Sequence, residues 1–370
     1  MSAAMRGGLV RLKEIQQHIL SKIKNMSDAV DYALTDVVMS AYVLEPDGQQ
    51  IPQSSSPRVI AAALRLLQVP PGARVLEVGT GSGYSTALLA HLVGSDGFVV
   101  SLDVDSNLVK RASSLLAQNN LANVKVVVAD GRSGYSTEAP FDRIIVWATA
   151  DILPQIWIEQ LCPGGLIVAP VRLRQLAAAT AIARVRLDTN KNLVGERVIP
   201  GGFVPLTDKP LTHWYGYAQD ADIKAEIKIE NAETETEVIW ASAEWLRQEQ
   251  QMGEAEQILE LMQVASHQES PLYPDEDVEA LCAYLLATYP ENLTTAYTQT
   301  LGPAIGCSQP GSLALLSLCG EGYAVAGERE AAVKVSDWIS SWRASGRPGF
   351  EQLQPVLNYV ECGYQVGVTL

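Results

Sequence analysis

The stretch Val75-Leu-Glu77-Val-Gly79-Thr-Gly81-Ser-Gly83-Tyr84 decides the fold of this chain. Its first residues are apolar and branched, which predicts a short strand that is covered on both faces. The strand ends in an acid, and the three glycines that follow permit a tight turn and a close approach of the backbone to a bound nucleotide. An apolar helix is predicted directly after the last glycine. Strand, glycine turn and helix in this order are typical of a nucleotide-binding α/β sheet.

The alternation of strand and helix continues along the chain. Short strands rich in Val and Ile are predicted at 74–78, 98–102, 124–129, 143–147 and 166–170, and helices at 58–68, 84–93, 107–119 and 153–161. Two further apolar segments, 179–187 and 193–199, flank a polar turn and predict an antiparallel hairpin. Repeated βα units predict a doubly wound α/β sheet with parallel strands, which this hairpin closes.

The flanking segments complete the predicted organisation. Before the sheet, two helices are expected at 11–24 and 28–40, followed by a polar loop. Beyond about Leu206 the pattern becomes mixed α+β, with strands at 223–229, 312–318 and 323–326 and helices at 243–262, 277–287 and 328–342. We therefore expect N-terminal helices and a polar loop (1–56), a nucleotide-binding domain (57–206) and a C-terminal α+β domain (207–370).

Charge is distributed unevenly between the two halves. The chain has 27 Lys+Arg and 42 Asp+Glu, a net charge of -15, which would repel a phosphate backbone, so no nucleic-acid partner is expected. Residues 1–206 hold 19 basic and 17 acidic residues, whereas 207–370 hold 8 and 25. Two interpretations stay open for the acidic half: it serves solubility, or it recognises a basic peptide or partner.

The cysteine, histidine and hydropathy patterns argue against a disulfide-rich, a metal-binding and a membrane protein. The five cysteines are widely spaced without a CxxC pair, which fits neither a disulfide framework nor a zinc site. The four histidines lack metal-ligand spacing, so no metal is expected. No uncharged apolar run reaches the roughly 18 residues that cross a membrane, and the N-terminus lacks the apolar core of a signal peptide. We expect a cytoplasmic protein without a membrane partner.

The acid at the end of the first strand indicates which nucleotide is bound. The pyrophosphate of a dinucleotide would meet Glu77 at the mouth of the glycine turn and be repelled. S-adenosylmethionine carries a positive ammonium and no phosphate, so the carboxylate favours this cofactor. Asp103 ends the next strand, where an acid can accept hydrogen bonds from both ribose hydroxyls.

Further motifs narrow the family. These are Pro140-Phe-Asp142-Arg-Ile-Ile-Val-Trp-Ala148-Thr-Ala150, Pro163-Gly164-Gly165 and Gly202-Phe203-Val204-Pro205-Leu206. Together with the glycine stretch they resemble the protein-L-isoaspartate O-methyltransferase family of class I S-adenosylmethionine-dependent methyltransferases, over about residues 14–206. The resemblance implies a Rossmann-like methyltransferase sheet in residues 57–206, with the polar loop before it binding the methyl acceptor.

The resemblance also implies site residues. Aligned on Pro57, the active-site serine of the family falls at Ser55, with Ser54 and Ser56 beside it; a turn or helix-cap role is the alternative for each serine. The expected cofactor residues are Glu77, Gly79, Thr80, Gly81, Ser82, Gly83, Tyr84, Asp103, Val104, Asp130, Gly131 and Trp147. Trp147 stands where the family has small residues, and it either walls the pocket or packs in the core.

Departures from the family pattern leave several hypotheses about function open. The serine-rich loop and the long acidic extension look like members that tailor ribosomally made peptides, methylating an aspartate that then cyclises to aspartimide. The second hypothesis is general repair of isoaspartyl proteins, and the third is a methyltransferase for another small molecule or protein. A cofactor-binding module without turnover is a separate, fourth hypothesis. The first two predict a peptide or protein partner that carries Asp or isoAsp. A carboxylate is already ionised at neutral pH, so neither requires a general base.

Overall fold

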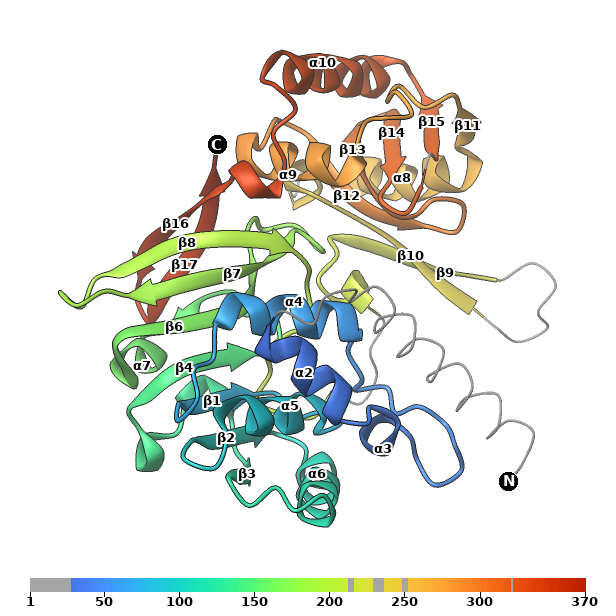
Figure 1. Cartoon of the computed structure of the whole chain (residues 1–370). Helices are drawn as coiled ribbons and strands as arrows, with labels where there is room; N and C mark the ends of the chain where they lie inside the picture. The colour runs from blue at the N-terminus through green and yellow to red at the C-terminus, as the bar shows by residue number, and fades with distance from the viewer. Residues whose placement is uncertain (1–27, 212–215, 229–235, 248–251, 321) are drawn as a thin grey trace.

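Figure 1 shows the computed structural model of the chain, in which residues 28–211, 216–228, 236–247, 252–320 and 322–370 are described. The helix predicted at 11–24 lies outside these residues. The described strands form two seven-stranded sheets and one three-stranded sheet. The first seven-stranded sheet carries the glycine turn, and the second belongs to the acidic half of the chain.

The first sheet has the strand order β3-β2-β1-β4-β6-β7-β8. The five strands β3, β2, β1, β4 and β6 run parallel to one another, whereas β7 and β8 are antiparallel and close the sheet as a hairpin. This arrangement confirms the predicted doubly wound fold. The strands are β1 (Arg74–Val78), β2 (Phe98–Asp103), β3 (Val124–Val128), β4 (Phe141–Val146), β6 (Leu161–Arg172), β7 (Thr180–Leu187) and β8 (Leu193–Pro200).

Helices and later elements cover the two faces of this sheet. The helices of this half are α2 (Ala29–Asp36), α3 (Ser40–Val43), α4 (Pro57–Leu67), α5 (Tyr84–Val93), α6 (Ser106–Gln118) and α7 (Gln155–Glu159). Alternate strand residues face opposite sides. Val75 and Val99 pack with α2, α4 and α5 in one apolar cluster. Leu76 and Val100 belong to a second cluster, which continues into side chains of the C-terminal half, including Trp342.

The second sheet is antiparallel, with the strand order β11-β15-β14-β13-β12-β10-β9. Its strands are β9 (Ile223–Lys228), β10 (Thr236–Ala243), β11 (Ser266–Gln268), β12 (Leu293–Thr298), β13 (Gly302–Gln309), β14 (Ser312–Ser317) and β15 (Tyr323–Gly327). Its helices are α8 (Met252–Val264), α9 (Val278–Thr288) and α10 (Glu330–Ala344). Alternation along β10 sends Ile239 toward α8 and Trp240 toward the opposite face.

The small sheet joins the two halves. Strands β16 (Gln354–Val360) and β17 (Gly363–Thr369) form a hairpin, and β17 pairs with β5 (Leu153–Pro154) of the first half. Figure 1 shows this hairpin beside β7 and β8, away from the second sheet that precedes it in the chain. The division at residue 206 remains a prediction, and the hairpin lies against the first half although it follows the second.

Three predicted elements differ from the structure. The helix predicted at 243–262 differs at its start: Ala243 ends β10, which pairs with β12, and Glu244–Arg247 form a short 3-10 helix. After residues 248–251, which are outside the described part, α8 spans Met252–Val264. The helix predicted at 153–161 gives its first two residues to β5. The helix predicted at 28–40 is broken at Val37, whose backbone is extended. At Ala243 and at Leu153–Pro154, strand pairing overrides the local helical periodicity of the sequence.

Candidate active site

The turn after β1 brings the acceptor loop and the cofactor residues together. Gly79 and Gly81 have φ values of +96° and +51°, a region that favours glycine. A Cβ atom on Gly81 would lie 3.0 Å from the carbonyl oxygen of Gln53, in the loop before α4. The positive φ and this close approach both favour glycine at position 81. Ser54, the residue after Gln53, belongs to the predicted acceptor loop.

Glu77 lies beneath the turn and is completely buried. Its Oε1 accepts hydrogen bonds from Ser85 Oγ at 2.6 Å and Trp147 Nε1 at 2.8 Å. Its Oε2 accepts from Ser101 Oγ at 2.6 Å and from Thr86 Oγ1. Burial raises the pKa of Glu77, while the four donors favour the charged form. The carboxylate thus joins β1, β2, α5 and the segment after β4, with no exposed edge toward a ligand.

Asp103 lies at the mouth of the turn. Its Oδ2 accepts the Gly81 N–H at 2.9 Å, and its Oδ1 accepts the Asp105 N–H at 3.0 Å. The side chain is half-buried, and burial raises its pKa. Val104, also half-buried, follows at the end of β2. The structure therefore places Asp103 and the glycine turn together, as the spacing predicts for a ribose-binding acid.

Asp130 and Gly131 follow β3 at the same edge of the sheet. A Cβ atom on Gly131 would lie 2.2 Å from Val78 Cγ1, so glycine is required for this loop to pack on β1. Its carbonyl accepts the Trp157 indole N–H at 2.8 Å. Asp130 pairs with Arg132 at 2.8 Å, and this partner lowers the pKa of Asp130. Gly131 is thus fixed by packing, whereas Asp130 is engaged by a neighbouring cation.

The remaining turn residues have side chains directed into the protein. Thr80, Ser82 and Tyr84 are all buried. Thr80 Oγ1 lies 2.7 Å from Ser101 Oγ, and the Tyr84 ring lies 6.2 Å from the ring of Tyr42. A ligand at this turn would therefore meet their backbone rather than their side chains.

The three serines of the acceptor loop have different environments. Ser54 Oγ is buried and has no hydrogen-bond partner in the described structure. Ser55 is half-buried and Ser56 exposed, and their hydroxyls also make no hydrogen bond to a described residue. Ser56 precedes α4, but its side chain does not cap the helix. Buried hydroxyls are normally paired, so the loop leaves hydrogen-bonding capacity for a ligand.

Trp147 and Thr149 hold residues 203–206 against the turn. The Trp147 ring packs edge-on against Phe203, with ring centroids 5.7 Å apart, and its Cβ would lie 3.3 Å from a Cβ on Gly79. Thr149 Oγ1 donates to the Phe203 carbonyl at 2.7 Å and accepts the Phe203 N–H at 2.9 Å. Trp147 is 8% exposed, so it packs in the core and also backs the glycine turn.

Arg111 is a positioning residue that the sequence pattern did not identify. From α6, its guanidinium donates to the carbonyls of Tyr42 at 2.6 Å, Leu44 at 2.9 Å and Ser82 at 3.3 Å. It thereby ties the segment before the acceptor loop to the glycine turn. The only sequence signal is a single arginine on an amphipathic helix, which is commonly a solvent-exposed residue.

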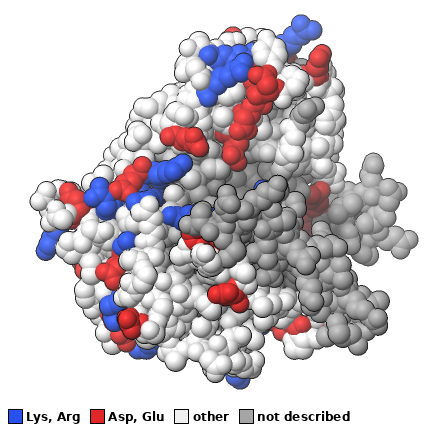
Figure 2. Space-filling view, in the orientation of Figure 1, with Lys and Arg blue, Asp and Glu red and all other residues white. Residues whose placement is uncertain are grey.

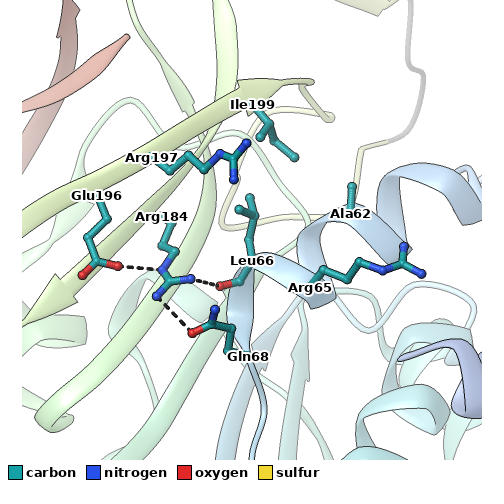
Figure 3. Close-up of a pocket in the computed structure, with 8 residues that line it drawn as sticks. All are labelled: Ala62, Arg65, Leu66, Gln68, Arg184, Glu196, Arg197 and Ile199. Atoms are coloured by element: carbon teal, nitrogen blue, oxygen red, sulfur yellow. Dashed lines mark hydrogen bonds and ion pairs between the residues drawn. The ribbon is translucent and has the colours of Figure 1, made fainter. Parts of the chain in front are cut away.

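A groove away from the glycine turn contains an arginine that stabilises the end of α4. Figure 3 shows it between the C-terminal half of α4 and the β7–β8 hairpin. Its volume is about 490 Å³. Arg184 donates to the Leu66 carbonyl and to Gln68 Oε1, both at 3.1 Å, and to Glu196 at 2.7 Å. The arginine thus satisfies the end of α4, where the helix dipole favours a cation. The serine loop lies at the other end of this helix.

In the part of the chain that the structure describes, no helix is long and apolar enough to cross a membrane. The described residues also contain no group of three or more His, Cys, Asp or Glu side chains arranged to hold a metal ion.

Comparisons with known proteins match mainly the first half of the chain. Residues 11–211 match the protein-L-isoaspartate(D-aspartate) O-methyltransferase family. A protein-L-isoaspartate O-methyltransferase of Anaeromyxobacter dehalogenans is 39% identical over 188 residues, which are 50% of this chain and 86% of that protein. Protein-L-isoaspartate O-methyltransferase 2 of Archaeoglobus fulgidus is 44% identical over 117 residues, which are 32% of this chain and 53% of that protein. The match thus spans about half the length of the archaeal relative.

Solved structures extend the likeness to the C-terminal half. A protein-L-isoaspartate O-methyltransferase structure covers 97% of this chain and 99% of its own, with a TM-score of 0.50 and 18% identity, so the fold is shared. A Plasmodium falciparum protein in complex with S-adenosyl-L-homocysteine covers 53% of this chain and 98% of its own, with a TM-score of 0.45 and 22% identity. The family match confirms the predicted enzyme class and cofactor, S-adenosylmethionine. The chain belongs to the protein-L-isoaspartate(D-aspartate) O-methyltransferase family.

Proposed function

We propose that this chain methylates the free carboxylate of L-isoaspartyl residues in peptides and proteins. The observation that supports the proposal is the contact between the two loops: Gln53 lies against Gly81, and the next residue, Ser54, has a buried hydroxyl without a partner in the described structure. A carboxylate that enters this loop would find hydroxyl donors without competing protein partners. The names of the relatives support isoaspartate as the acceptor.

The residues present fit S-adenosylmethionine at two points. The glycine turn has no side chains to fill its cradle, and Asp103 offers a half-buried carboxylate beside the Gly81 N–H. When bound, the cofactor supplies an electrophilic methyl group on a sulfonium. Glu77 acts as a positioning residue, because its oxygens are fully used in holding the turn.

The protein contributes orientation rather than proton transfer. One oxygen of the ionised acceptor forms the new C–O bond while the sulfonium–methyl bond breaks, and the sulfur keeps the electron pair. No proton moves, so no general base is needed. Ser55 and Ser54 orient the carboxylate by hydrogen bonds, and Trp147 with Phe203 keeps the neighbouring wall in place.

The test compares an isoaspartyl hexapeptide with the same peptide containing ordinary aspartate. Methyl ester and the succinimide that forms from it, measured by mass spectrometry, are expected only with the isoaspartyl peptide. Ser55→Ala should slow methyl transfer about ten- to a hundredfold with little change in cofactor affinity. Ser56→Ala is the matched control, because its exposed hydroxyl lies at the helix start. Methylation of the aspartyl peptide alone would contradict the proposal.

Peptide tailoring is the alternative function, with less support. Its sequence argument depends partly on the long C-terminal extension, but a solved structure of a protein-L-isoaspartate O-methyltransferase covers 97% of this chain. The extension therefore does not distinguish the two functions. Efficient methylation of the isoaspartyl hexapeptide would favour repair over tailoring.

A further inference from the structure

An open cavity of about 880 Å³ lies between the two halves of the chain. One wall is Pro200, Gly201 and Gly202, which immediately precede Phe203 of the candidate active site. The facing walls come from β10, α9 and β12 of the acidic half. We refer to this space as the interface cavity. Its volume falls within the range of ligand-binding sites in proteins, roughly 300–1,000 Å³.

The chemistry of the interface cavity is aromatic and acidic. Its lining contains Tyr217, Trp240 and Tyr297, together with the carboxylates of Glu226, Glu237 and Glu279. The described lining includes no Lys or Arg, and Lys224, on the same face of β9 as Glu226, donates instead to the Ala218 carbonyl at 3.2 Å. Aromatic faces and carboxylates both attract a cation that carries an apolar stem.

The lining is held in place by its own contacts. Tyr297 donates to Glu237 Oε1 at 2.6 Å, whereas Oε2 of that half-buried carboxylate has no described partner. Trp240 is 4% exposed and packs with Tyr217 and Tyr297. The cavity thus offers a preformed aromatic wall with an unused carboxylate oxygen.

We propose that the interface cavity binds a basic side chain, Lys or Arg, of the polypeptide being methylated, at a position near the isoaspartate. The inference rests on the proposed function, since it concerns the substrate of the same site. The continuous backbone from Pro200 to Phe203 links the cavity to the wall of the active site, so an extended substrate can reach both. The acidic half then contributes substrate selection by charge and aromatic contact.

The test uses isoaspartyl peptides in matched pairs, identical except that one lysine near the isoaspartate is replaced with norleucine. The pairs differ in where the lysine stands relative to the isoaspartate. In the pair with the largest effect, the wild-type enzyme should have a KM about tenfold lower for the lysine peptide than for the norleucine peptide. In the double variant Glu237→Gln/Glu279→Gln this KM ratio should fall close to one. Gln at 237 still accepts the Tyr297 hydrogen bond, so the aromatic wall is retained.

The matched control is Glu256→Gln/Glu260→Gln. It removes the same charge from α8, which packs on the opposite face of the second sheet, and it should keep the tenfold ratio. With the wild-type enzyme alone, raising NaCl should lower the ratio, because salt screens the charge contact. These measurements decide the question even if the cavity variant does not fold.

The outcomes separate this inference from the proposed function. If neither peptide is methylated, the proposed function fails. If both are methylated with equal KM, or if the control loses the ratio as the cavity variant does, the cavity inference is overturned while the function stands. n-Butylamine tests a free amine as the ligand: it should compete only with the lysine peptide, and activation of the norleucine peptide would overturn the assignment to a substrate side chain.

Discussion

At the scale of single residues, the site depends on how one buried charge is satisfied. Glu77 accepts four hydrogen bonds from three different segments, and none of them comes from its own strand. A buried carboxylate without partners would cost far more than a buried neutral group. The glycine turn is therefore positioned by a network whose centre never reaches the surface.

Trp147→Phe should lower the free energy of unfolding by about 1.5–3 kcal/mol, because it removes a donor from this buried charge. Trp245→Phe is the matched control: its indole N–H donates at 3.0 Å to the neutral Ser308 hydroxyl, so the expected loss is only about 0.5–1.5 kcal/mol. Urea unfolding measures both. Equal losses would mean that the charge of Glu77 adds nothing to the Trp147 contact.

Asp103→Ala should weaken S-adenosylmethionine binding about tenfold or more, since an anionic acceptor of the ribose hydroxyls contributes roughly 1.5–3 kcal/mol. Isothermal titration calorimetry on the folded variant measures this loss. Asp105→Ala serves as a control for the local backbone, because Asp105 caps α6 and does not reach the glycine turn. Unchanged affinity in Asp103→Ala would remove Asp103 from the cofactor site.

At the scale of elements, the pairing of β17 with β5 is one of the contacts that tie the end of the second half to the first. A Cβ atom on Gly363 would lie 2.1 Å from the Leu153 carbonyl oxygen, so the two strands meet at a position that only glycine allows. Val366 and Val368 of β17 are buried in the same cluster as Leu76. The hairpin is thus part of the core of the first half.

Gly363→Ala should therefore destabilise the protein by about 1–3 kcal/mol through overpacking at the β5–β17 junction. Gly367→Ala, in the same strand, is the control, because an added Cβ there meets nothing within 4 Å. Thermal unfolding should separate the two variants by several degrees. Equal stability of both would show that the strands can separate without cost.

The elements that the sequence predicted are those whose signal is local. The glycine turn, β1 and α5 follow from adjacent residues, and their bounds agree with the prediction. The β16–β17 hairpin was missed because Pro355, Gly363 and Gly367 weaken the strand pattern, and its partner Leu153 lies far away in the chain. The setting of Glu77 was missed for the same reason: its donors include Trp147, which is distant in sequence.

At the scale of the whole molecule, the two halves share one apolar cluster, so cutting the chain near Thr207 removes core side chains as well as acidic charge. Variants in which Glu is replaced with Gln therefore test the role of the acidic half better than truncation does. Figure 2 shows Lys and Arg side chains interspersed with Asp and Glu along the β7–β8 hairpin, without a continuous basic surface on the described part of this face. The second half, with 8 basic and 25 acidic residues, is therefore the part to which we assign selection of substrates by charge.

Acid unfolding of the whole chain should depend on Glu276. Its buried side chain pairs with Arg343 at 2.6 Å and Arg347 at 2.9 Å, and the Arg343 hydrogen bond lowers the pKa of Glu276 to about 2. The folded pKa is depressed, so this stabilisation is complete above the unfolded pKa of about 4.5 and is lost as the pH falls toward 2.

Glu276→Gln should thus lower the free energy of unfolding by about 1.5–3 kcal/mol at pH 7, and the difference from wild type should shrink below pH 4.5. Glu351→Gln is the control, since that exposed carboxylate is 4.0 Å from Arg197 and should change stability by less than about 0.5 kcal/mol. Denaturant titrations across this pH range measure both. A difference that does not vary with pH would contradict the ion-pair account.

The β5–β17 pairing also has a consequence for the order of folding. Leu153 and Tyr364 are about 210 positions apart in the chain, whereas Val75 and Val99 of the neighbouring β1–β2 pair are about 24 apart. Contacts between distant positions form slowly, because the intervening loop must close first. The methyltransferase sheet is therefore expected to assemble before β5, which lies outside that sheet, pairs with β17. During that interval the unpaired backbone of β5 is a site where two nascent chains can pair and aggregate.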